Sequence, residues 1–455
     1  MPELTLSNLL EFTRDGEWGE SAPCAGYVRM QVVRGTDFER VRFGDLSTLP
    51  IRYIRKDIAE RKALKAGDLL IETAGGTKDQ PTGRTVLISE AIIEAATDPL
   101  IPASFARFLR TKSDAVDSAY LFWKLQAEYK SGAIFPYHIQ HTGVARFQYT
   151  QFAASHILDL PGDMDYQRDV ASTLTALDDK IGLNRRMNET LEAISQAIFR
   201  DWFIDFGPVR RKMAGVTDPV AIMGGLTLGP NRAAELAALF PAALDDDDLP
   251  VGWSERPIGE LVDIAGGSTP STADESLWQP AEHRWATPKD LSSMSDLALF
   301  ETGRRISAAG LAKITSGLLP VGTVLLSSRA PIGYLAIAQA PVAINQGFIA
   351  LKPTKDFGSA YLYLWCKANM EAVLANANGS TFQEISKKNF RPITSAVPGE
   401  CSLIRAFGEI AEPMFARIVS AAAENRTLAE TRDYLLPRLM SGEVRVGDAA
   451  LEIAA

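Results

Sequence analysis

Polar and basic side chains that could contact a nucleic acid gather in four loops of this chain, two in each half. The first loop of each half spans residues 72–84 and 327–334, and the second spans residues 142–148 and 378–388. Loop residues of these types can approach phosphates closely and reach base edges, although ordinary surface loops share this composition. The candidates for phosphate contacts are three lysines and one arginine, of which Lys289 lies outside the four loops: Lys78, Arg84, Lys289 and Lys387. The candidates for contacts with base edges are Arg146, Ser328, Arg329, Ser380, Thr381 and Gln383. Gln148 is a further candidate for DNA contact.

Motifs for catalysis are not apparent in the sequence. It contains no Asn-Pro-Pro-Tyr or Asp-Pro-Pro-Tyr methylation motif, no glycine-rich methyl-donor loop and no GxxxxGK[ST] phosphate loop. The three cysteines are widely spaced, and none of the four histidines has a recognisable nucleophile beside it, so neither a metal site nor a catalytic triad is expected. Asp45 with Glu60 and Lys62 loosely matches a magnesium nuclease pattern, but Glu-x-Lys recurs by chance in long chains.

Charge is unevenly distributed along the 455 residues, whose formal net charge is −9. Residues 1–158 and 250–393 are each close to neutral, and the negative excess lies in 159–206, 207–249 and 394–455. Because the globular blocks are neutral and the segments between and after them are acidic, we expect this chain by itself to have only modest affinity for DNA. A partner protein would supply further positive charge. The sequence shows neither a membrane-spanning run nor a secretory signal, and with so few cysteines we expect a cytoplasmic protein.

A repeat defines the elements that must position the loops. The segment from Pro161 to Ile198 recurs 237 residues later from Pro398 to Leu435, and each copy follows a block with strand-like patterning. The chain therefore reads as two tandem halves, each a globular block followed by a long helix. Duplicated halves that fold alike tend to be related by a pseudo-twofold axis, and such axes let proteins read two half-sites on DNA.

The repeated segments have the three-four spacing of a coiled-coil seam. We predict that the two helices lie antiparallel, with Asn188 opposite or nearly opposite Asn425; the alternative is that each helix packs only on its own block. Pro437 is expected to end or kink the second helix. The predicted helix-helix and partner interface comprises Leu177, Ile181, Asn188, Leu191, Ile198, Met414, Ile418, Asn425, Leu428 and Leu435.

The predicted fold class is mixed α/β, with two globular domains and two long helices. Between the halves, the basic run at 210–212, the paired glycines at 224–225 and the acidic run at 245–248 indicate an exposed crossover with room for a short helix at 232–239. The predicted divisions are 1–158 (first domain), 159–206 (first spacer helix), 207–249 (linker), 250–397 (second domain), 398–442 (second spacer helix) and 443–455 (tail).

Several segments together resemble the specificity (S) subunit of type I restriction-modification systems. They are Leu249–Trp253, Ile258–Asp263, Gly266–Pro270, Leu318–Gly333, Glu424–Leu428 and Leu435–Gly442, with Asn184–Leu191 and Asp201–Phe203 in the first helix. The resemblance covers essentially the whole chain and is strongest from residue 249 onward. It implies two target recognition domains that read the two parts of a split sequence in double-stranded DNA, with the antiparallel helices as a ruler between them.

The resemblance also implies partners. Two methyltransferase subunits would dock on this chain, and two ATP-dependent restriction subunits can join them. S-adenosylmethionine, ATP and Mg²⁺ would bind to those partners, and no cofactor is expected in this chain. The predicted function is therefore that of a non-catalytic DNA-specificity subunit; the alternatives are a helical scaffold without sequence-specific DNA binding, or a self-sufficient magnesium-dependent nuclease.

Overall fold

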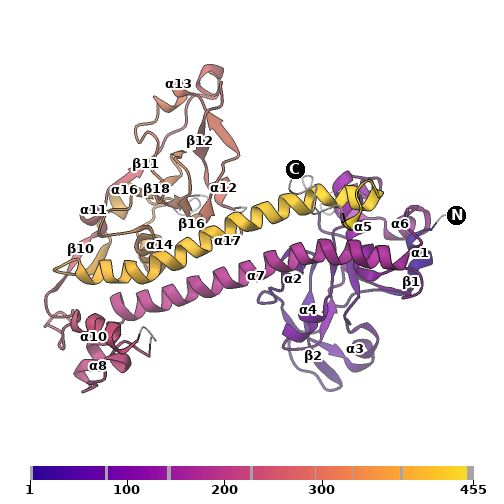
Figure 1. The fold of residues 1–455 in the computed structure, drawn as a ribbon, viewed down its shortest axis with the longest axis horizontal. Helices are drawn as coiled ribbons and strands as arrows, with labels where there is room; N and C mark the ends of the chain where they lie inside the picture. The colour runs from indigo at the N-terminus through magenta and orange to yellow at the C-terminus, as the bar shows by residue number, and fades with distance from the viewer. Residues whose placement is uncertain are drawn as a thin grey trace. The chain divides into compact units, whose positions relative to one another are not determined.

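The computed structural model describes residues 4–76, 80–140, 145–225, 229–292, 294–329, 331–379 and 383–447 (Figure 1). The chain forms two compact units. Unit 1 comprises Met1–Arg185 together with Glu424–Ala455, and unit 2 comprises Arg186–Ala423. Among the described residues, no helix is long and apolar enough to cross a membrane.

The globular part of unit 1, here the N-terminal domain, is built on a four-stranded antiparallel sheet of order β1-β7-β4-β5. A second sheet, β3-β2-β6, has β3 antiparallel and β6 parallel to its central strand. The strands are β1 (Leu10–Asp15), β2 (Tyr27–Val33), β3 (Ile51–Arg55), β4 (Leu69–Glu72), β5 (Thr85–Leu87), β6 (Leu100–Pro102), β7 (Ala106–Thr111), β8 (His138–Gln140) and β9 (Ala145–Phe147). The helices are α1 (Leu6–Leu9), α2 (Phe38–Arg42), α3 (Lys56–Lys62), α4 (Glu90–Ala95), α5 (Ser118–Ser131) and α6 (Tyr149–Ser155), with 3-10 turns at Gly35–Asp37 and Phe135–Tyr137.

The globular part of unit 2, here the C-terminal domain, has a similar topology, with one more strand in its main sheet, β13, which pairs parallel to β16. Its main sheet has the order β11-β18-β15-β16-β13, and its second sheet, β14-β12-β17, again has one antiparallel and one parallel neighbour. The strands are β10 (Trp253–Pro257), β11 (Ile264–Gly266), β12 (His283–Ala286), β13 (Ala298–Leu299), β14 (Arg304–Ile306), β15 (Val324–Ser328), β16 (Ile332–Ala338), β17 (Ala343–Ile344), β18 (Phe348–Leu351) and β19 (Thr394–Pro398). The helices are α11 (Ile258–Leu261), α12 (Pro288–Ser292), α13 (Ala308–Leu311), α14 (Ser359–Ala368), α15 (Met370–Ala375) and α16 (Lys387–Phe390), with a 3-10 turn at Glu275–Leu277.

Equivalent glycine turns lead into the buried central strands of the two domains. Gly67 and Gly322 have φ values of +88° and +85°, a region that favours glycine, and the strands that follow them, β4 and β15, are buried throughout. The Gly67 amide donates to the Ile88 carbonyl, and the Gly322 amide donates to the Ala338 carbonyl. The duplication predicted from the sequence therefore extends to the turns that set the strand positions.

Two 40-residue helices, α7 (Met164–Phe203) and α17 (Ser402–Ser441), each contribute one half to each unit. In unit 1, Leu174 shares a hydrophobic core with Leu435. Further along α7, Asn184 Nδ2 donates to Asn425 Oδ1 at 2.9 Å. As the residue number on α7 increases, the number of the residue that it meets on α17 decreases, so the two helices are antiparallel in unit 1.

The helix segments of unit 2 also run antiparallel. Asn188 Nδ2 donates to the Ile418 carbonyl at 3.4 Å, and the Ser195 hydroxyl lies 3.3 Å from Met414 Sδ. The Phe199 ring packs edge-on against Phe407, with 5.7 Å between ring centroids. The mixed α/β architecture with two domains and an antiparallel pair of long helices is confirmed.

The predicted helix-interface residues range from partly buried to buried. Asn188, Ile181, Ile198, Ile418 and Leu435 are buried. The other five are Leu177, Leu191, Met414, Asn425 and Leu428, which are partly buried. Asn425 does face an asparagine, but its partner is Asn184, which also donates to Glu424 Oε2 at 2.9 Å. The predicted Asn188–Asn425 match is corrected, because each of these residues finds its partner within its own unit.

Pro437 was expected to end or kink the second helix; it does not end it, because α17 continues to Ser441, and a kink there stays a prediction. A proline inside a helix removes one backbone hydrogen bond and crowds the preceding turn, at a cost of about 3 kcal/mol. Leu435, Leu436 and Leu439 are almost fully buried on either side of Pro437. Their burial, at about 1.5–3 kcal/mol each, outweighs that cost.

The segment 207–249, predicted as an exposed linker, has the short helix expected near 232–239 and an exposed acidic run at 245–248, but the rest of it is largely packed into unit 2. It contains α8 (Gly207–Met213), α9 (Pro219–Ile222) and α10 (Pro230–Ala238). Their apolar side chains join the core of that unit, where Phe240 packs edge-on against Trp202 at 5.4 Å. Arg211 makes a bidentate ion pair with Asp201. The basic run at 210–212 therefore holds this helical insert together, since Lys212 Nζ also donates to the carbonyls of Ala237 and Phe240.

Candidate nucleic-acid interface

In the N-terminal domain, the two predicted loops lie against each other through backbone hydrogen bonds. The Phe147 amide donates to the Thr73 carbonyl at 2.9 Å, and the Gly75 amide donates to the Ala145 carbonyl at 3.2 Å. Ala74 and Arg146 form an isolated antiparallel bridge between them. Loops that are more than 60 residues apart in the sequence thus make one surface at the end of β4.

The C-terminal domain brings its own two loops together in the same way. The Ile385 amide donates to the Ser328 carbonyl at 3.0 Å, and Arg329 bridges Glu384. The Arg329 guanidinium lies 3.8 Å from the Glu384 carboxylate, and its side chain is 35% exposed. Arg329 therefore stands at the junction of the two loops with part of its guanidinium accessible to solvent.

A third loop, which the sequence did not single out, completes the surface in each domain. In the N-terminal domain it is the turn from β6 to β7, where the Phe105 carbonyl accepts from the Thr73 amide at 2.8 Å. In the C-terminal domain it is the turn from β17 to β18, where the Gly347 carbonyl accepts from the Ser328 amide at 2.8 Å. Each domain thus has three loops joined by equivalent hydrogen bonds.

Two glycines allow the close approach that these turns require. A Cβ atom on Gly16 would lie 2.0 Å from the Ala103 carbonyl oxygen, and one on Gly267 would lie 1.8 Å from that of Ile344. Beside Gly267, the Thr269 hydroxyl donates to Gln346 Oε1 at 2.5 Å. Thr269, Asn345 and Gln346 are therefore polar candidates in the C-terminal domain that the loop composition alone did not reveal. The equal length of the two turns could have pointed to them.

The predicted contact residues differ in accessibility. Exposed side chains belong to Arg146, Gln148, Lys289, Gln383 and Lys387. Ser328 is buried, at 2% exposure, and its main chain links the loops. Lys78, Ser380 and Thr381 lie outside the described residues.

Arg84 is engaged by a buried carboxylate. Its Nε and Nη2 donate to the two oxygens of Glu72 at 2.9 and 2.6 Å, and the Glu72 side chain is only 2% exposed. Burial alone would lower the pKa of Arg84, but the hydrogen bonds and charge of Glu72 raise it, so the guanidinium stays charged. Its charge is balanced within the domain, and Arg84 is a weaker phosphate candidate than the exposed Arg146.

Replacing Arg84 by alanine is expected to lower the stability of the N-terminal domain by about 2–3 kcal/mol, because the Glu72 carboxylate would be left buried and unpaired. Hydrogen exchange of the amides in β4 and β5 would measure this loss. The matched control is Arg146→Ala, which removes an exposed guanidinium from the same surface and should leave exchange unchanged. Equal exchange in the two variants would contradict the assignment.

A cleft of about 670 Å³ lies beside the three loops of the N-terminal domain, lined by Asp15, Thr73, Arg107, Phe147, Gln148, Tyr149, Thr150, Gln151 and Ala154. The Arg107 guanidinium stacks 4.4 Å from the centre of the Tyr149 ring and lies 3.3 Å from the Asp15 carboxylate. Burial raises the pKa of Tyr149, although its hydrogen bond with Thr13 and the charge of Arg107 oppose this. The tyrosine therefore stays a neutral phenol, and the cleft presents amide, hydroxyl and guanidinium groups.

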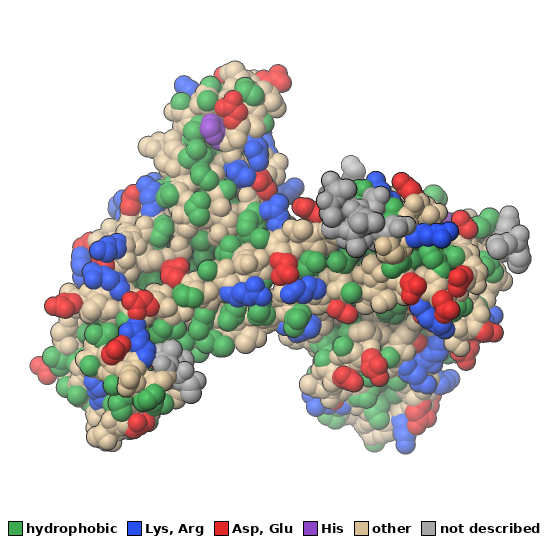
Figure 2. Space-filling view, in the orientation of Figure 1, with side chains coloured by type: hydrophobic (Ala, Val, Ile, Leu, Met, Phe, Trp, Pro, Cys, Tyr) green, Lys and Arg blue, Asp and Glu red, His purple; other side chains and the backbone are tan. Residues whose placement is uncertain are grey.

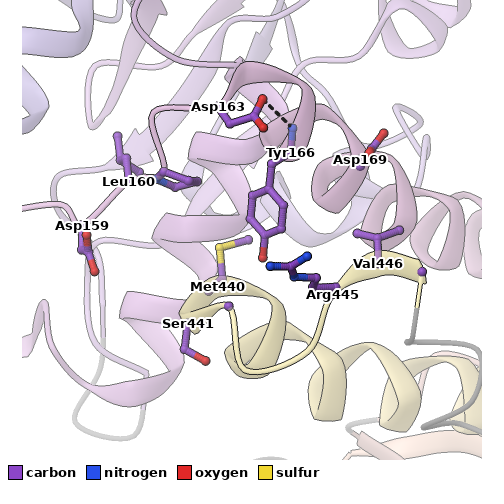
Figure 3. A pocket seen from close by; sticks show the side chains of 12 residues that line it. Asp159, Leu160, Asp163, Tyr166, Asp169, Met440, Ser441, Arg445 and Val446 are labelled. Carbon is purple, nitrogen blue, oxygen red and sulfur yellow. Dashed lines mark hydrogen bonds between the residues drawn. The ribbon is translucent and has the colours of Figure 1, made fainter.

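A second cavity, of about 710 Å³, lies within unit 1 where the start of α7 meets the end of α17 (Figure 3). Its lining includes Asp159, Asp163 and Asp169, with Arg445 beside Tyr166. The Tyr166 hydroxyl donates to the Leu439 carbonyl at 2.9 Å. Three carboxylates oppose phosphate binding, so this cavity is not part of the candidate interface.

Charge does not single out the interface on the face that Figure 2 shows, where Lys and Arg side chains are interspersed with Asp and Glu. The described ranges, 4–447 with their gaps, contain no group of three or more His, Cys, Asp or Glu that could hold a metal ion. The loops thus offer hydrogen-bonding groups and isolated cations, which suit recognition of a polar surface.

The chain is similar in sequence to several known proteins. Residues 250–398 match the family described as "Type I restriction modification DNA specificity domain". The chain is 26% identical over 424 residues to the type I restriction enzyme HindI specificity subunit of Haemophilus influenzae, with 84% of this chain and 88% of the relative covered. It is 35% identical over 156 residues to the MjaIX specificity subunit of Methanocaldococcus jannaschii, with 34% and 36% covered.

A solved structure supports the fold. The S subunit of a type I restriction-modification system from M. genitalium superposes with a TM-score of 0.53, covering 96% of this chain and 95% of that one at 13% identity. At this identity the likeness is evidence for the fold alone. The domain that the family model matches, residues 250–398, is of the DNA-specificity class. The resemblance to type I restriction-modification specificity subunits that was seen in the sequence is confirmed by the family model over residues 250–398 and by these relatives.

Proposed function

We propose that this chain reads a bipartite sequence in double-stranded DNA, one part through each globular domain. The observation that carries the proposal is the repeated three-loop surface, because its backbone framework is the same in both domains while the side chains differ. Thr73, Phe105 and Arg146 stand in one domain where Ser328, Gly347 and Glu384 stand in the other. A backbone framework that the two domains share, with different side chains on it, suits two recognition surfaces for two different half-sites.

In this proposal the chain also positions catalytic partners. Two methyltransferase subunits would bind it and carry S-adenosylmethionine, and two restriction subunits that use ATP and Mg²⁺ can join the complex. An adenine to be modified would be flipped into a partner's pocket and not into this chain. The proposal places the complex in the cytoplasm.

The test is to co-express this chain with its cognate methyltransferase and to sequence the modified bases in the host DNA. We expect methylation at a split motif, with two specific parts separated by a gap of fixed length. The methyltransferase expressed alone is the control and should give no such motif. Methylation that is independent of this chain, or confined to one undivided motif, would overturn the proposal.

The two alternatives predict other results. A helical scaffold would support complex assembly but give no sequence-dependent shift of DNA in a gel. A self-sufficient nuclease would cut DNA when supplied with Mg²⁺ alone, and we expect no cleavage by the purified chain.

A further inference from the structure

Phe105 has the most exposed side chain among the large apolar residues described, with 64% of its surface accessible. It lies in the turn from β6 to β7, inside the three-loop surface of the N-terminal domain. We propose that Phe105 is a specificity-determining residue that contacts the C5-methyl group of a thymine in the half-site read by this domain. This inference rests on the proposed function and deepens it.

The backbone of Phe105 is fixed in place. Its carbonyl accepts two hydrogen bonds from Thr73, one from the amide at 2.8 Å and one from the hydroxyl at 3.0 Å. The turn itself is closed by the Ala106 amide, which donates to the Ala103 carbonyl at 2.8 Å. Holding a large apolar ring in water on a rigid turn gains nothing for folding, since the ring is not buried. A contact made on binding would recover that apolar area.

In the C-terminal domain, the turn that corresponds to the Phe105 turn has different side chains. Three residues join β6 to β7 (Ala103–Phe105), and three join β17 to β18 (Asn345–Gly347). Because Phe105 and Gly347 accept the equivalent hydrogen bond, the two turns correspond residue by residue. One turn thus presents an exposed aromatic ring, and the other carries Asn345 and Gln346, whose amide oxygens accept from Gly347 and Thr269 while their NH₂ groups can still donate. Amides suit hydrogen bonding to adenine, whereas an apolar side chain suits the thymine methyl group.

The surroundings of Phe105 favour base edges over a purely apolar partner. Thr73, which anchors Phe105, also lines the cleft with Gln148, Thr150 and Gln151. These side chains can donate and accept hydrogen bonds in the major groove, where the thymine methyl lies beside the O4 acceptor. A ring whose backbone is held by a residue of this cleft can therefore touch the methyl group while the polar residues of the cleft bind adjacent base edges.

The experiment uses the complex of this chain with its methyltransferase, and duplexes that carry the motif methylated by the wild-type complex. In a series of these duplexes, each thymine of the motif is replaced in turn by uracil, which lacks only the methyl group. We expect uracil at one position of one half-site to slow methylation by the wild-type complex about three- to tenfold. Phe105→Ala should slow methylation of the thymine duplex by a similar factor and be insensitive to uracil at that position.

Two further variants complete the design. Phe105→Leu keeps an apolar side chain and should retain most of the preference for thymine over uracil. Ile157→Ala removes another exposed apolar side chain of the same unit, which is 50% exposed and lies outside the three loops, and should behave as wild type.

A wild-type complex that is specific for its motif but indifferent to uracil at every position would overturn the inference and leave the proposed function standing. So would additive losses from uracil and Phe105→Ala, which would indicate that the ring acts elsewhere, for example as a wedge between base pairs. A wild-type complex without any sequence specificity would instead refute the proposed function itself.

Discussion

Replacing Asp178 by alanine will lower the stability of unit 1 by about 3–5 kcal/mol. Asp178 lies on α7 and accepts from Arg42 of the N-terminal domain at 2.5 Å and from Arg432 of α17 at 2.6 Å. The side chains of all three are at least four-fifths buried, with exposures of 8%, 17% and 10%. Without the carboxylate, Arg42 would lose its ion pair and keep only its hydrogen bond to Gln126, and Arg432 would keep only Asp433 as its acidic partner. Hydrogen exchange of unit 1 amides in increasing urea would measure the loss.

The matched control is Asp165→Ala on the same helix. Asp165 also pairs with an arginine, Arg168 at 2.9 Å, but its side chain is 88% exposed. A solvent-exposed ion pair contributes at most about 1 kcal/mol, so this variant should remain close to wild type. If Asp178→Ala proved no more damaging than Asp165→Ala, the three charges would not be the buried junction that their distances indicate.

Replacing Arg329 by alanine will relax one base position in one half of the split target and leave the other half unchanged. Arg329 joins the two loops of the C-terminal domain, and its only ion pair in the described structure, to Glu384, is long at 3.8 Å. A well-placed arginine discriminates between bases by about 1–3 kcal/mol, and about 1.4 kcal/mol corresponds to a tenfold change. Sequencing of methylated sites, weighted by their extent of modification, would show the added sequences.

Arg256→Ala provides the control for this experiment. Arg256 belongs to β10 in the same domain, is 48% exposed and lies 3.7 Å from Glu260, so its environment is similar but it is outside the three loops. It should keep the full motif. If Arg329→Ala also kept the complete two-part motif, Arg329 would be removed from the base-reading residues.

Much of the architecture could be predicted because the sequence contains an internal repeat. The repeated seam spacing predicted two long helices, and the strand-like patterning before each of them predicted two globular blocks. The adjacency of the loops around Thr73 and Arg146 was not predicted. It depends on backbone pairing between distant segments, which residue composition does not encode.

The predictions that the structure corrects share a physical cause: tertiary packing outweighed the preference of the local sequence. Burial of Leu435 and Leu439 keeps α17 helical through Pro437. The basic run at 210–212 looked like a solvated linker, yet Arg211 and Lys212 are tied to acceptors inside unit 2. Phe105 was not predicted as a contact residue, because a single apolar residue in a short turn forms no sequence pattern. Its candidate role follows from the structural correspondence with the turn at Gly347.

Unit 1 is assembled from the two ends of the chain, with consequences for the order in which the protein can fold during synthesis. Leu435, Leu436 and Leu439 complete the same core as Leu69 and Trp123. Unit 2 consists of one continuous segment, residues 186–423, so its folding does not require residues 424–455 to have been synthesised. The N-terminal domain, although made first, must wait with part of its apolar surface uncovered until α17 has emerged. Nascent chains that stall before residue 424 should therefore be the ones that chaperones and proteases recognise.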